Sequence, residues 1–314
     1  MNPNIDSQIT SGGTGAAASS VNQISRVSNA LLVVLFVLLS VACLYPLLLV
    51  IAVSFTDEHA IALHGYNIIP KQLSDYAYRY LFKDPGEIIR GYGVSILVTV
   101  VGTIGSLLLT ALYAFPISRK DMPYRNVLAF IVFFTMLFSG GLVPWYLAYS
   151  VAGLKDTLWA LIIPNLVVPF NVLIMRTFFS NTIPGSLIEA AKIDGAGEVR
   201  IFAQIILPLS TPVMATIGLF QTLTYWNDWF TSSVFISNNH LVSLQYLMYK
   251  VINNIQYLNS GRVDASVAGK VAATIPTETV RMAMAIVGIG PIILVYPFLQ
   301  KYFVKGLTVG SVKG

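Results

Sequence analysis

Long runs of apolar residues without charge constrain this chain more than any other feature. The run from Leu31 to Leu39 contains only Leu, Val and Phe. Of the 314 residues, 55% are hydrophobic and 11% are charged, whereas ordinary soluble domains carry roughly 25% charged residues. So few charges could not cover the surface of a compact soluble protein of this size. The sequence therefore predicts a chain that lies in lipid.

The apolar runs are numerous enough to predict a bundle of spanning helices. A helix that crosses a bilayer needs about 20 predominantly apolar residues. We predict six such spans, at about 29–55, 94–117, 127–149, 158–179, 213–236 and 281–303. Prolines interrupt the fourth span and the sixth, and packed neighbouring helices can satisfy the backbone groups that prolines leave free. The expected fold class is an all-α membrane protein whose transmembrane domain covers 28–304.

The two ends of the chain are predicted to lie outside this bundle. Residues 1–27 are rich in Ser, Gly, Ala, Asn and Gln, so they cannot bury enough apolar area to order themselves. Residues 305–314 form a short second tail. Basic residues concentrate in the loop after the second span and in the C-terminal tail: Arg119, Lys120, Arg125, Lys301, Lys305 and Lys313. Because Lys and Arg favour the cytoplasmic side, both termini are expected there.

The formal net charge of +5 does not indicate a nucleic-acid partner. The basic residues are scattered, without a dense patch, and an excess of this size is typical of the cytoplasmic loops of membrane proteins. Cys43 is the single cysteine, and His59, His64 and His240 lack the spacing of metal ligands. We therefore expect no metal site and no disulfide framework.

The polar loop at 180–212 predicts two short helices joined by a turn. Ser186 and Glu189 have the spacing of a capping box, so a helix beginning near 184–186 would run to Asp194. Gly195 can adopt the left-handed conformation that ends a helix. A second helix is expected over 198–206, with Val199, Phe202 and Ile206 on its apolar face and with Pro208 as its stop.

This pair of helices suits a docking element on the cytoplasmic side. Ala190 and Ala191 have small side chains that allow another surface to approach closely, and Glu189 and Asp194 carry charges that could pair with basic residues of a partner. The alternative is an amphipathic connector in the lipid interface. The acidic residues speak against it, because interfacial helices favour Lys and Arg.

The spacing in this loop resembles the signature of permease subunits in binding-protein-dependent ABC importers. That signature is Glu-Ala-Ala, three residues, Gly, nine residues, Ile, any residue, Leu-Pro. The chain matches it at Glu189, Ala190, Ala191, Gly195, Ile205, Leu207 and Pro208. The segment from Ile183 to Ala196, the Trp226-Asn227 pair and the C-terminal tail resemble the MalG-type, carbohydrate-importing branch. Within that branch the chain resembles the YtcP- and LplC-like group, which is associated with oligosaccharides that include uronate-rich ones.

The resemblance implies a fold, partners and a location. It implies a type I ABC importer permease with six transmembrane helices in a bacterial plasma membrane, both termini cytoplasmic. The loop would be the coupling-helix pair that seats on a separate ATPase, with Glu189 as charged contact and Gly195 as turn. Lys305, Gly306, Lys313 and Gly314 in the tail would reach into the ATPase dimer. The implied partners are a second homologous permease, two ATPase subunits and an extracytoplasmic sugar-binding protein.

A possible substrate path lies in the fifth span. The aromatic, amide and acidic residues there suit a sugar, which has apolar C–H faces and many hydroxyls: Tyr225, Trp226, Asn227, Asp228 and Trp229. An ionisable residue at membrane depth also indicates function. The alternative is that Trp226 and Trp229 belong to an interfacial aromatic belt and that Asp228 lies near the outer water.

Other motifs are missing, and their absence narrows the function. No phosphate-binding loop of the form G-x-x-x-x-G-K-[ST] occurs, so ATP and Mg²⁺ are expected on the partner ATPase, with no cofactor and no catalytic residue in this chain. An ion-coupled secondary transporter of small polar solutes is the alternative, but it predicts more intramembrane charges and an inverted repeat. An intramembrane enzyme would need several acid–base or metal-binding groups that converge within the spans, and one aspartate does not supply them.

Overall fold

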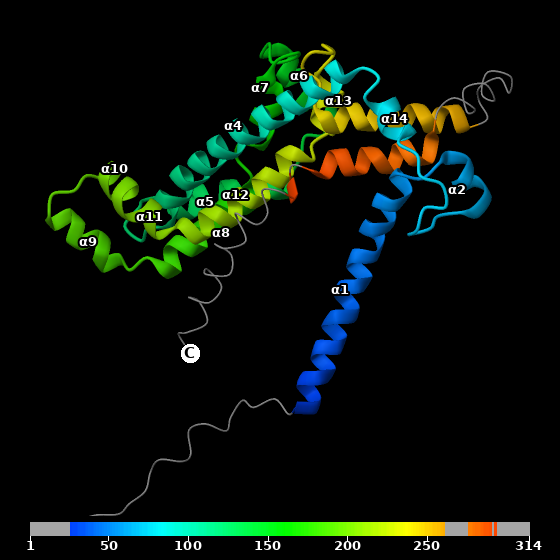
Figure 1. Cartoon of the computed structure of the whole chain (residues 1–314). Coiled ribbons are helices and arrows are strands. Elements are labelled where there is room, and N and C mark those ends of the chain that lie inside the picture. Colours follow the sequence, from blue (N-terminus) through cyan, green and yellow to red (C-terminus); the bar gives the residue numbers. More distant parts are fainter. Residues whose placement is uncertain (1–25, 261–275, 291, 294–314) are drawn as a thin grey trace, which may run out of the picture. The chain divides into compact units, whose positions relative to one another are not determined.

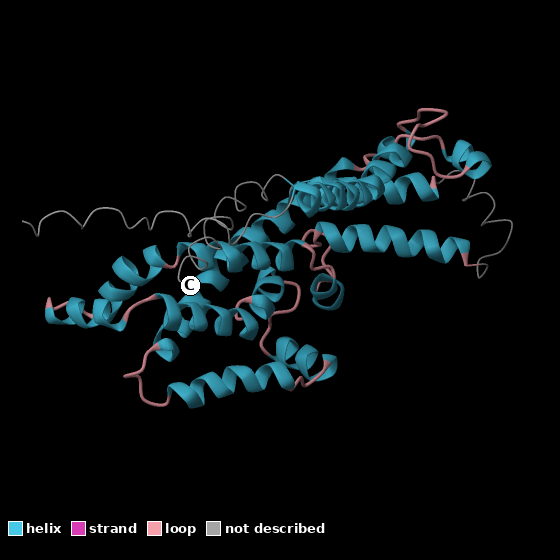
Figure 2. Ribbon diagram, turned by 90° about the horizontal axis from the view of Figure 1, so that it is seen from below, coloured by secondary structure: helices cyan, strands magenta, loops and turns pink. Residues whose placement is uncertain are grey.

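The protein consists of helices connected by loops. A computed structural model describes residues 26–260, 276–290 and 292–293, and Figure 2 shows helices throughout this part of the chain. The β-structure of the described residues is limited to one isolated antiparallel bridge, between Thr56 and Leu73. The chain divides into two compact units, Met1–Val50 and Ile51–Gly314.

The first unit contains most of helix α1, Arg26–Ser54. Its composition is apolar on all sides, which is typical of a helix surrounded by lipid or by other helices. The one hydroxyl near its middle is satisfied within the helix, because Ser40 Oγ donates to the Phe36 carbonyl at 2.8 Å. The helix begins before 29, so residues 26 and 27 of the predicted N-terminal tail are helical. The rest of that tail lies outside the described residues.

The second unit holds the remaining helices, arranged as in Figure 1. In chain order they are α2 (Glu58–His64), α3 (Tyr76–Leu81), α4 (Pro85–Ser118), α5 (Arg125–Leu137), α6 (Leu142–Val151), α7 (Leu158–Ile162), the 3₁₀-helix η1 (Ile163–Asn165), α8 (Pro169–Thr182), α9 (Gly185–Ile193), α10 (Glu198–Ile201), the π-helix η2 (Phe202–Ile206), α11 (Leu207–Leu209), α12 (Thr211–Trp226), α13 (Phe230–Phe235) and α14 (Leu244–Asn259). A last described helix covers 277–290.

Helix α4 is the central element of the second unit. It packs against α12, α8, α14, α7 and α5, and Figure 1 shows α12 running beside it. Its first turns meet α14, since a Cβ added at Gly91 would lie 3.3 Å from Leu244 Cα. Its far end is followed by Arg119, which pairs with Glu198 of α10. At a rise of about 1.5 Å per residue, the helix separates Gly91 from Arg119 by about 40 Å.

The third predicted span is not continuous. The structure divides 127–149 into α5 and α6, which meet at an angle of 115°. The break falls at Ser139, Gly140 and Gly141, where Gly141 has φ +82°. A residue in this left-handed conformation cannot continue a right-handed helix, and glycine adopts it without steric cost. Because residues 127–149 are predominantly apolar, the sequence pattern indicates one span and does not reveal this break.

The other predicted spans correspond to helices with shifted limits. Helix α4 begins at Pro85, before the predicted 94, and the fourth span bends by 47° between η1 and α8. The fifth divides into α12 and α13 near Asn227. Helix 277–290 covers the start of the sixth span, whose remainder lies outside the described residues apart from 292–293. Among the described residues, α1 and α4 are long and apolar enough to cross a membrane alone.

A glycine allows α4 and α12 to approach closely, which gives a direct test. We expect Gly102→Ala to lower the free energy of unfolding by about 1–3 kcal/mol, because overpacking forces buried groups to move. The added Cβ would lie 2.5 Å from Tyr225 Cζ. The Tyr225 ring is 3% exposed and its hydroxyl donates to the Ile162 carbonyl at 2.8 Å. The measurement is the thermal unfolding midpoint of the purified protein in detergent.

The matched control is Gly93→Ala in the same helix. No atom lies within 4 Å of the added Cβ there, and alanine favours helix more than glycine does. The control should keep or raise the midpoint. A Gly102→Ala protein as stable as the control would mean that the Tyr225 ring moves aside without cost.

Candidate functional site

The 180–212 loop folds into two helical segments joined at Gly195, as the sequence predicts. Helix α9 runs from Gly185 to Ile193, within the limits expected. Its start differs in detail from the prediction. Pro184 takes the N-cap position, and no side chain caps the helix, so Ser186 and Glu189 do not form a capping box. Proline at the cap has no side-chain acceptor, and Ser186 lies inside the first turn.

The turn after α9 is a glycine-dependent helix end. Gly195 has φ +79°, and its N–H donates to the Lys192 carbonyl at 3.0 Å. The next N–H, that of Ala196, donates to the Ala191 carbonyl at 2.9 Å. These two bonds are the pattern of a Schellman motif. The motif fixes the direction in which the chain leaves α9.

The second segment continues past Pro208, contrary to the prediction that proline stops it. Helix α10 passes into the π-helix η2 and then into α11, which ends at Leu209. Proline lacks an N–H, so an α-helix here would leave a carbonyl unpaired. In η2 the Leu207 N–H donates to the Phe202 carbonyl, one residue further back than in an α-helix. This change of register precedes the proline, and a 79° bend leads into α12.

Apolar side chains anchor the second segment in the protein core. Ile201, Phe202 and Ile206 are 0%, 7% and 1% exposed and belong to a cluster with side chains of α4, α5, α8 and α12. The Phe202 ring lies 5.5 Å from that of Phe115 on α4. The predicted apolar face was correct for Phe202 and Ile206. It was wrong for Val199, which is 82% exposed, because the buried stripe passes through Ile201 instead.

Four charged residues connect the loop to the end of α4. The Arg119 guanidinium pairs with the carboxylates of Asp121 and Glu198. Lys192 Nζ of α9 lies 3.3 Å from an oxygen of each of the same two carboxylates. The Arg119 side chain is only 11% exposed and its guanidinium carbon lies 5.6 Å from the centre of the Phe115 ring. Sequence reasoning missed this network because its members lie far apart in the chain.

The network holds the Asp121 carboxylate in the charged form. The hydrogen bond from Arg119, supported by one from Lys192, holds the pKa of Asp121 well below its usual range. The same hydrogen bond raises the pKa of Arg119. The ion pairs of Asp121 with Arg119 and Lys192 therefore persist at any pH near neutrality.

Helix α8 supplies a second connection to the same place. Arg176 Nε donates to the Ile117 carbonyl at 3.2 Å, and Ser180 Oγ donates to the Ser118 carbonyl at 3.2 Å. Both carbonyls belong to the last turn of α4, where no further helical N–H is present to bind them. A cation near a helix C-terminus is also favoured by the helix dipole. The end of α4 is thus held from two sides.

The tip of the loop remains exposed. Ile193 is 86% exposed, and Glu189, Ala190 and Asp194 are exposed beside it. Among the described residues, the carboxylates of Glu189 and Asp194 have no hydrogen-bond or ion-pair partner. Ala191 instead packs partly on the core cluster. Of the other signature residues, Ile205 and Leu207 are half-buried and Pro208 is exposed.

Two of the predicted substrate-path residues are tied into the fold by their polar groups. Tyr225 is buried and bonded to the Ile162 carbonyl. Asp228 accepts the Thr231 N–H at 3.0 Å near the start of α13, and an amide hydrogen of Asn165 at 3.4 Å. Trp229 stacks on Tyr249 with ring centres 3.9 Å apart. These three residues do not line the cavities described next.

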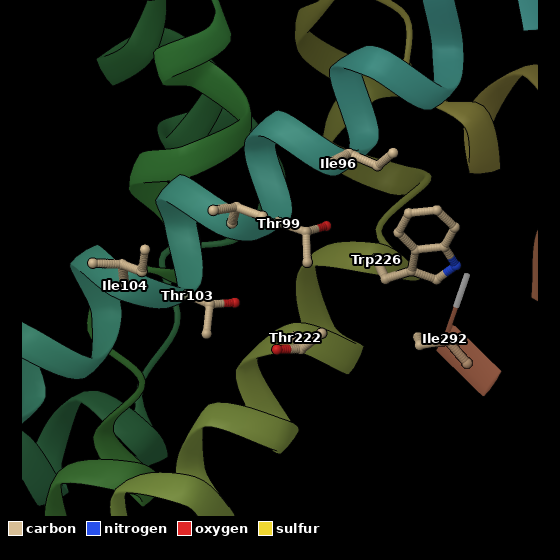
Figure 3. A pocket seen from close by; sticks show the side chains of 8 residues that line it. Ile96, Thr99, Thr103, Ile104, Thr222, Trp226 and Ile292 are labelled. Carbon is tan, nitrogen blue, oxygen red and sulfur yellow. The ribbon is translucent and has the colours of Figure 1, made fainter. Parts of the chain in front are cut away.

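Trp226 lies between two cavities, and Asn227 lines one of them. The first cavity, of about 300 Å³, is bounded by α4, α12 and Ile292. Figure 3 shows Thr99 and Thr103 of α4 on the side facing Thr222 and Trp226 of α12. The hydroxyls of Thr99 and Thr103 are buried and have no hydrogen-bond partner among the described residues. Sequence reasoning missed these threonines, although they recur at helical spacing.

The remaining predicted site residues belong to the C-terminal segment of the sequence. Lys305, Gly306, Lys313 and Gly314 lie outside the described residues.

The helical architecture and the signature in the 180–212 loop are those expected of an ABC importer permease. Residues 9–309 match the family described as binding-protein-dependent transport system inner membrane component. The chain belongs to this family. It is a multi-pass membrane protein and the permease subunit of a binding-protein-dependent importer.

Characterised relatives match nearly the whole chain. The polygalacturonan/rhamnogalacturonan transport system permease YtcP of Bacillus subtilis is 40% identical, over 92% of this chain and 99% of YtcP. Protein LplC of the same organism is 40% identical, over 86% of this chain and 89% of LplC. A chain from the crystal structure of a bacterial ABC transporter involved in the import of the acidic polysaccharide alginate superimposes with a TM-score of 0.75 at 30% identity. That match covers 90% of this chain and 99% of the other.

The charge network predicts a local loss of protection when its arginine is neutralised. We expect Arg119→Gln to raise the hydrogen-exchange rate of α9 and α10 about tenfold, which is roughly 1.4 kcal/mol of local opening free energy. The control is Lys120→Gln. Lys120 is the next residue in the chain, and its side chain is exposed, so the change removes the same charge without touching the network. Equal exchange in both variants would mean that the apolar anchor alone holds the loop.

The lowered pKa of Asp121 predicts how the network responds to acid. A carboxyl with a lowered pKa stabilises the fold above its ordinary pKa and loses this contribution only as the pH falls through the lowered value. Protection of α9 should therefore be equal at about pH 7 and about pH 5, after correction for the intrinsic exchange rate, and should weaken only in stronger acid. A loss of protection already at about pH 5 would contradict this assignment. The measurement is native-state hydrogen exchange followed by mass spectrometry.

Proposed function

We propose that this chain forms part of the translocation path for an oligosaccharide. ATP hydrolysis on separate subunits drives the transport, and the 180–212 loop transmits the motion of those subunits to this chain. The exposed tip of that loop, on a base fixed to α4, is the observation that carries the proposal. A rigid base transmits force, and an exposed tip is free to bind a partner. The signature contains no pair of nucleophile and base, so this chain acts without catalysis of its own.

The chemistry of the tip suits a protein partner. Ile193 and Val199, on the two sides of the Gly195 turn, are 86% and 82% exposed. Exposed apolar side chains with a polar rim are typical of interaction sites. Glu189 and Asp194 add charges without partners among the described residues. We expect basic residues at the rim of the ATPase surface and an apolar depression at its centre.

The family, together with the proposed separation of ATP hydrolysis from translocation, supports a particular set of subunits. We propose two ATPase subunits, which bind ATP and Mg²⁺, a second homologous permease and an extracytoplasmic sugar-binding protein. The chain would lie in a bacterial plasma membrane with both termini and the 180–212 loop on the cytoplasmic side. The C-terminal residues Lys305, Gly306, Lys313 and Gly314 would contact the ATPases.

The cargo is proposed to be an oligosaccharide that contains uronate. The relative named for polygalacturonan/rhamnogalacturonan and the alginate importer support a uronate-containing cargo, and the relative named for arabinooligosaccharides supports an oligosaccharide. Trp226 and Asn227 are the predicted path residues that border cavities. An indole edge and an amide together suit a ligand with apolar faces and hydroxyls.

A continuous set of contacts could carry motion from the loop to these cavities. The second helical segment packs in one cluster with α4 and α12, and α12 begins directly after the bend at Ser210. Trp226 is the last residue of α12, so a movement at the loop reaches it through one rigid helix. We propose that ATPase closure shifts this helix and changes the access to the cavities beside Trp226.

The turn of the loop gives a test of the coupling. We expect Gly195→Val to abolish most uptake and most stimulation of ATP hydrolysis by the loaded binding protein, while insertion and assembly remain normal. A β-branched residue at φ +79° is strongly disfavoured, so α9 would leave its docking direction. The assay is ATP hydrolysis and sugar uptake by the complete complex in proteoliposomes.

The matched control for the turn is Gly197→Ala. Gly197 lies two residues further on, with φ −73° and no atom near an added Cβ. It should keep nearly normal coupling. Normal stimulation in the Gly195→Val complex would contradict the docking role of the loop.

A further inference from the structure

We propose that the cavity between α12, α14 and helix 277–290 binds the carboxylate of an acidic sugar residue, with Arg281 as its cationic group. The inference rests on the proposed function, since it assigns a site to the oligosaccharide cargo. It goes beyond that function by naming the residues that would distinguish a uronate from a neutral sugar.

The cavity is of a size and composition that suit one part of a saccharide. Its volume is about 300 Å³, at the lower end of the range for ligand pockets. Its polar lining residues are Asn227, Gln245 and Arg281. The rest of the lining is mainly apolar and includes Trp226, Met248, Ile252, Met284 and Ile289. Arg281 is the one charged residue among the described lining residues.

Arg281 has hydrogen-bonding capacity to spare. Its Nη1 donates to both carboxylate oxygens of Glu278 at 3.1 Å. Its Nε is buried and has no hydrogen-bond partner among the described residues. A guanidinium offers five N–H donors in a planar fork that matches a carboxylate. The Nη2 group of Arg281 makes no hydrogen bond to the described residues, so its N–H groups are available to a ligand carboxylate in the cavity.

The Glu278 carboxylate is shared between Arg281 and Tyr66. Tyr66 donates to Glu278 Oε2 at 2.8 Å. Hydrogen bonding to Glu278 and burial raise the pKa of the Tyr66 hydroxyl, so this donor keeps its proton near neutral pH. The Glu278 side chain is thus held toward Tyr66 of the 57–93 segment. Arg281 lines the cavity and Glu278 does not.

A second acidic residue fixes the helix that presents Arg281. The Glu58 carboxylate accepts the backbone N–H groups of Glu278 and Thr279 at 2.9 and 3.0 Å. It also accepts the hydroxyls of Thr277 and Thr279 at 3.1 and 2.8 Å. These bonds satisfy the free N–H groups at a helix start. They set the position of the first turn, from which Arg281 reaches the cavity.

The amide side chains could bind the sugar hydroxyls. Asn227 Nδ2 donates to the Leu223 carbonyl at 2.9 Å, which leaves the amide oxygen of Asn227 as an acceptor without a described partner. Gln245 Nε2 reaches the Gly288 carbonyl only at 3.5 Å, the limit of a hydrogen bond. The Trp226 Nε1 already donates to that carbonyl at 2.9 Å. Gln245 is therefore free to turn toward a ligand.

The test measures equilibrium binding of trigalacturonate and of its methyl ester to the complete purified complex in neutral-lipid nanodiscs. The ester keeps the hydroxyls and the apolar faces but has no charge. The variants are Arg281→Gln and Arg281→Lys. Lys250→Gln is the control, because it removes a cation of α14 that lies outside the cavity. Glu278→Gln removes the ion pair while Arg281 remains.

We expect the Arg281→Gln complex to bind trigalacturonate about tenfold more weakly or worse and to bind the ester as the wild type does. Arg281→Lys should keep part of the affinity for the acid, and Lys250→Gln all of it. Glu278→Gln should keep or increase the affinity, because it frees Nη1. An equal loss for acid and ester in Arg281→Gln would overturn the proposal and make the residue structural. Unchanged binding of both, or no binding of the acid by the wild type, would overturn it as well.

An anionic lipid headgroup has related chemistry and is distinguished by a second arm. Phosphatidylglycerol in the nanodiscs should leave trigalacturonate binding unchanged; displacement that depends on Arg281 would identify a lipid site and overturn the sugar assignment. The proposed function is tested separately, by stimulation of wild-type ATP hydrolysis with the loaded binding protein. If neutral oligosaccharides stimulate the wild type and the acid never binds, the proposed function stands and this inference fails. If no oligosaccharide stimulates the wild type, the proposed function itself fails.

Discussion

The close packing of α4 against α12 is the contact on which the second unit depends. It is possible because Gly102 has no side chain where the Tyr225 ring crosses α4. Helix α4 then reaches from α14 at one end to the 180–212 loop at the other. Because both proposed functional regions are attached to the same two helices, the geometry of each depends on this one interface.

Polar groups in this apolar environment are used to fix positions. Gln221 is fully buried on α12 and donates to Ser106 of α4 and to the Asn165 carbonyl. Arg176 and Ser180 of α8 bind the last carbonyls of α4. In lipid an unpaired polar group is costly, so each such bond specifies which helices are neighbours. Seven buried side-chain polar atoms of the described residues have no hydrogen-bond partner, and three of them, at Thr99, Thr103 and Arg281, belong to residues that line the cavities.

The loop combines a fixed base with a free tip, and different forces produce the two. Burial of Ile201, Phe202 and Ile206 and the ion pairs of Arg119 hold the base. The Schellman turn at Gly195 directs α9 outward. The tip keeps the apolar Ile193 side chain exposed at a cost in solvation that a binding partner would recover. This arrangement explains why the signature residues are divided between packed and exposed positions.

The sequence alone determined the membrane environment, the helical class, the loop and its turn at Gly195. These follow from local properties: apolar length, glycine at a left-handed position, and the spacing of a short signature. The tertiary structure alone decided that the third run breaks at Gly141, that Arg119 meets Glu198 79 residues later, and that Asn227 borders a cavity while Tyr225 does not. It also decided that Glu58 caps the helix carrying Arg281. Such pairings depend on how helices approach one another in space, and no local pattern in the chain encodes that approach.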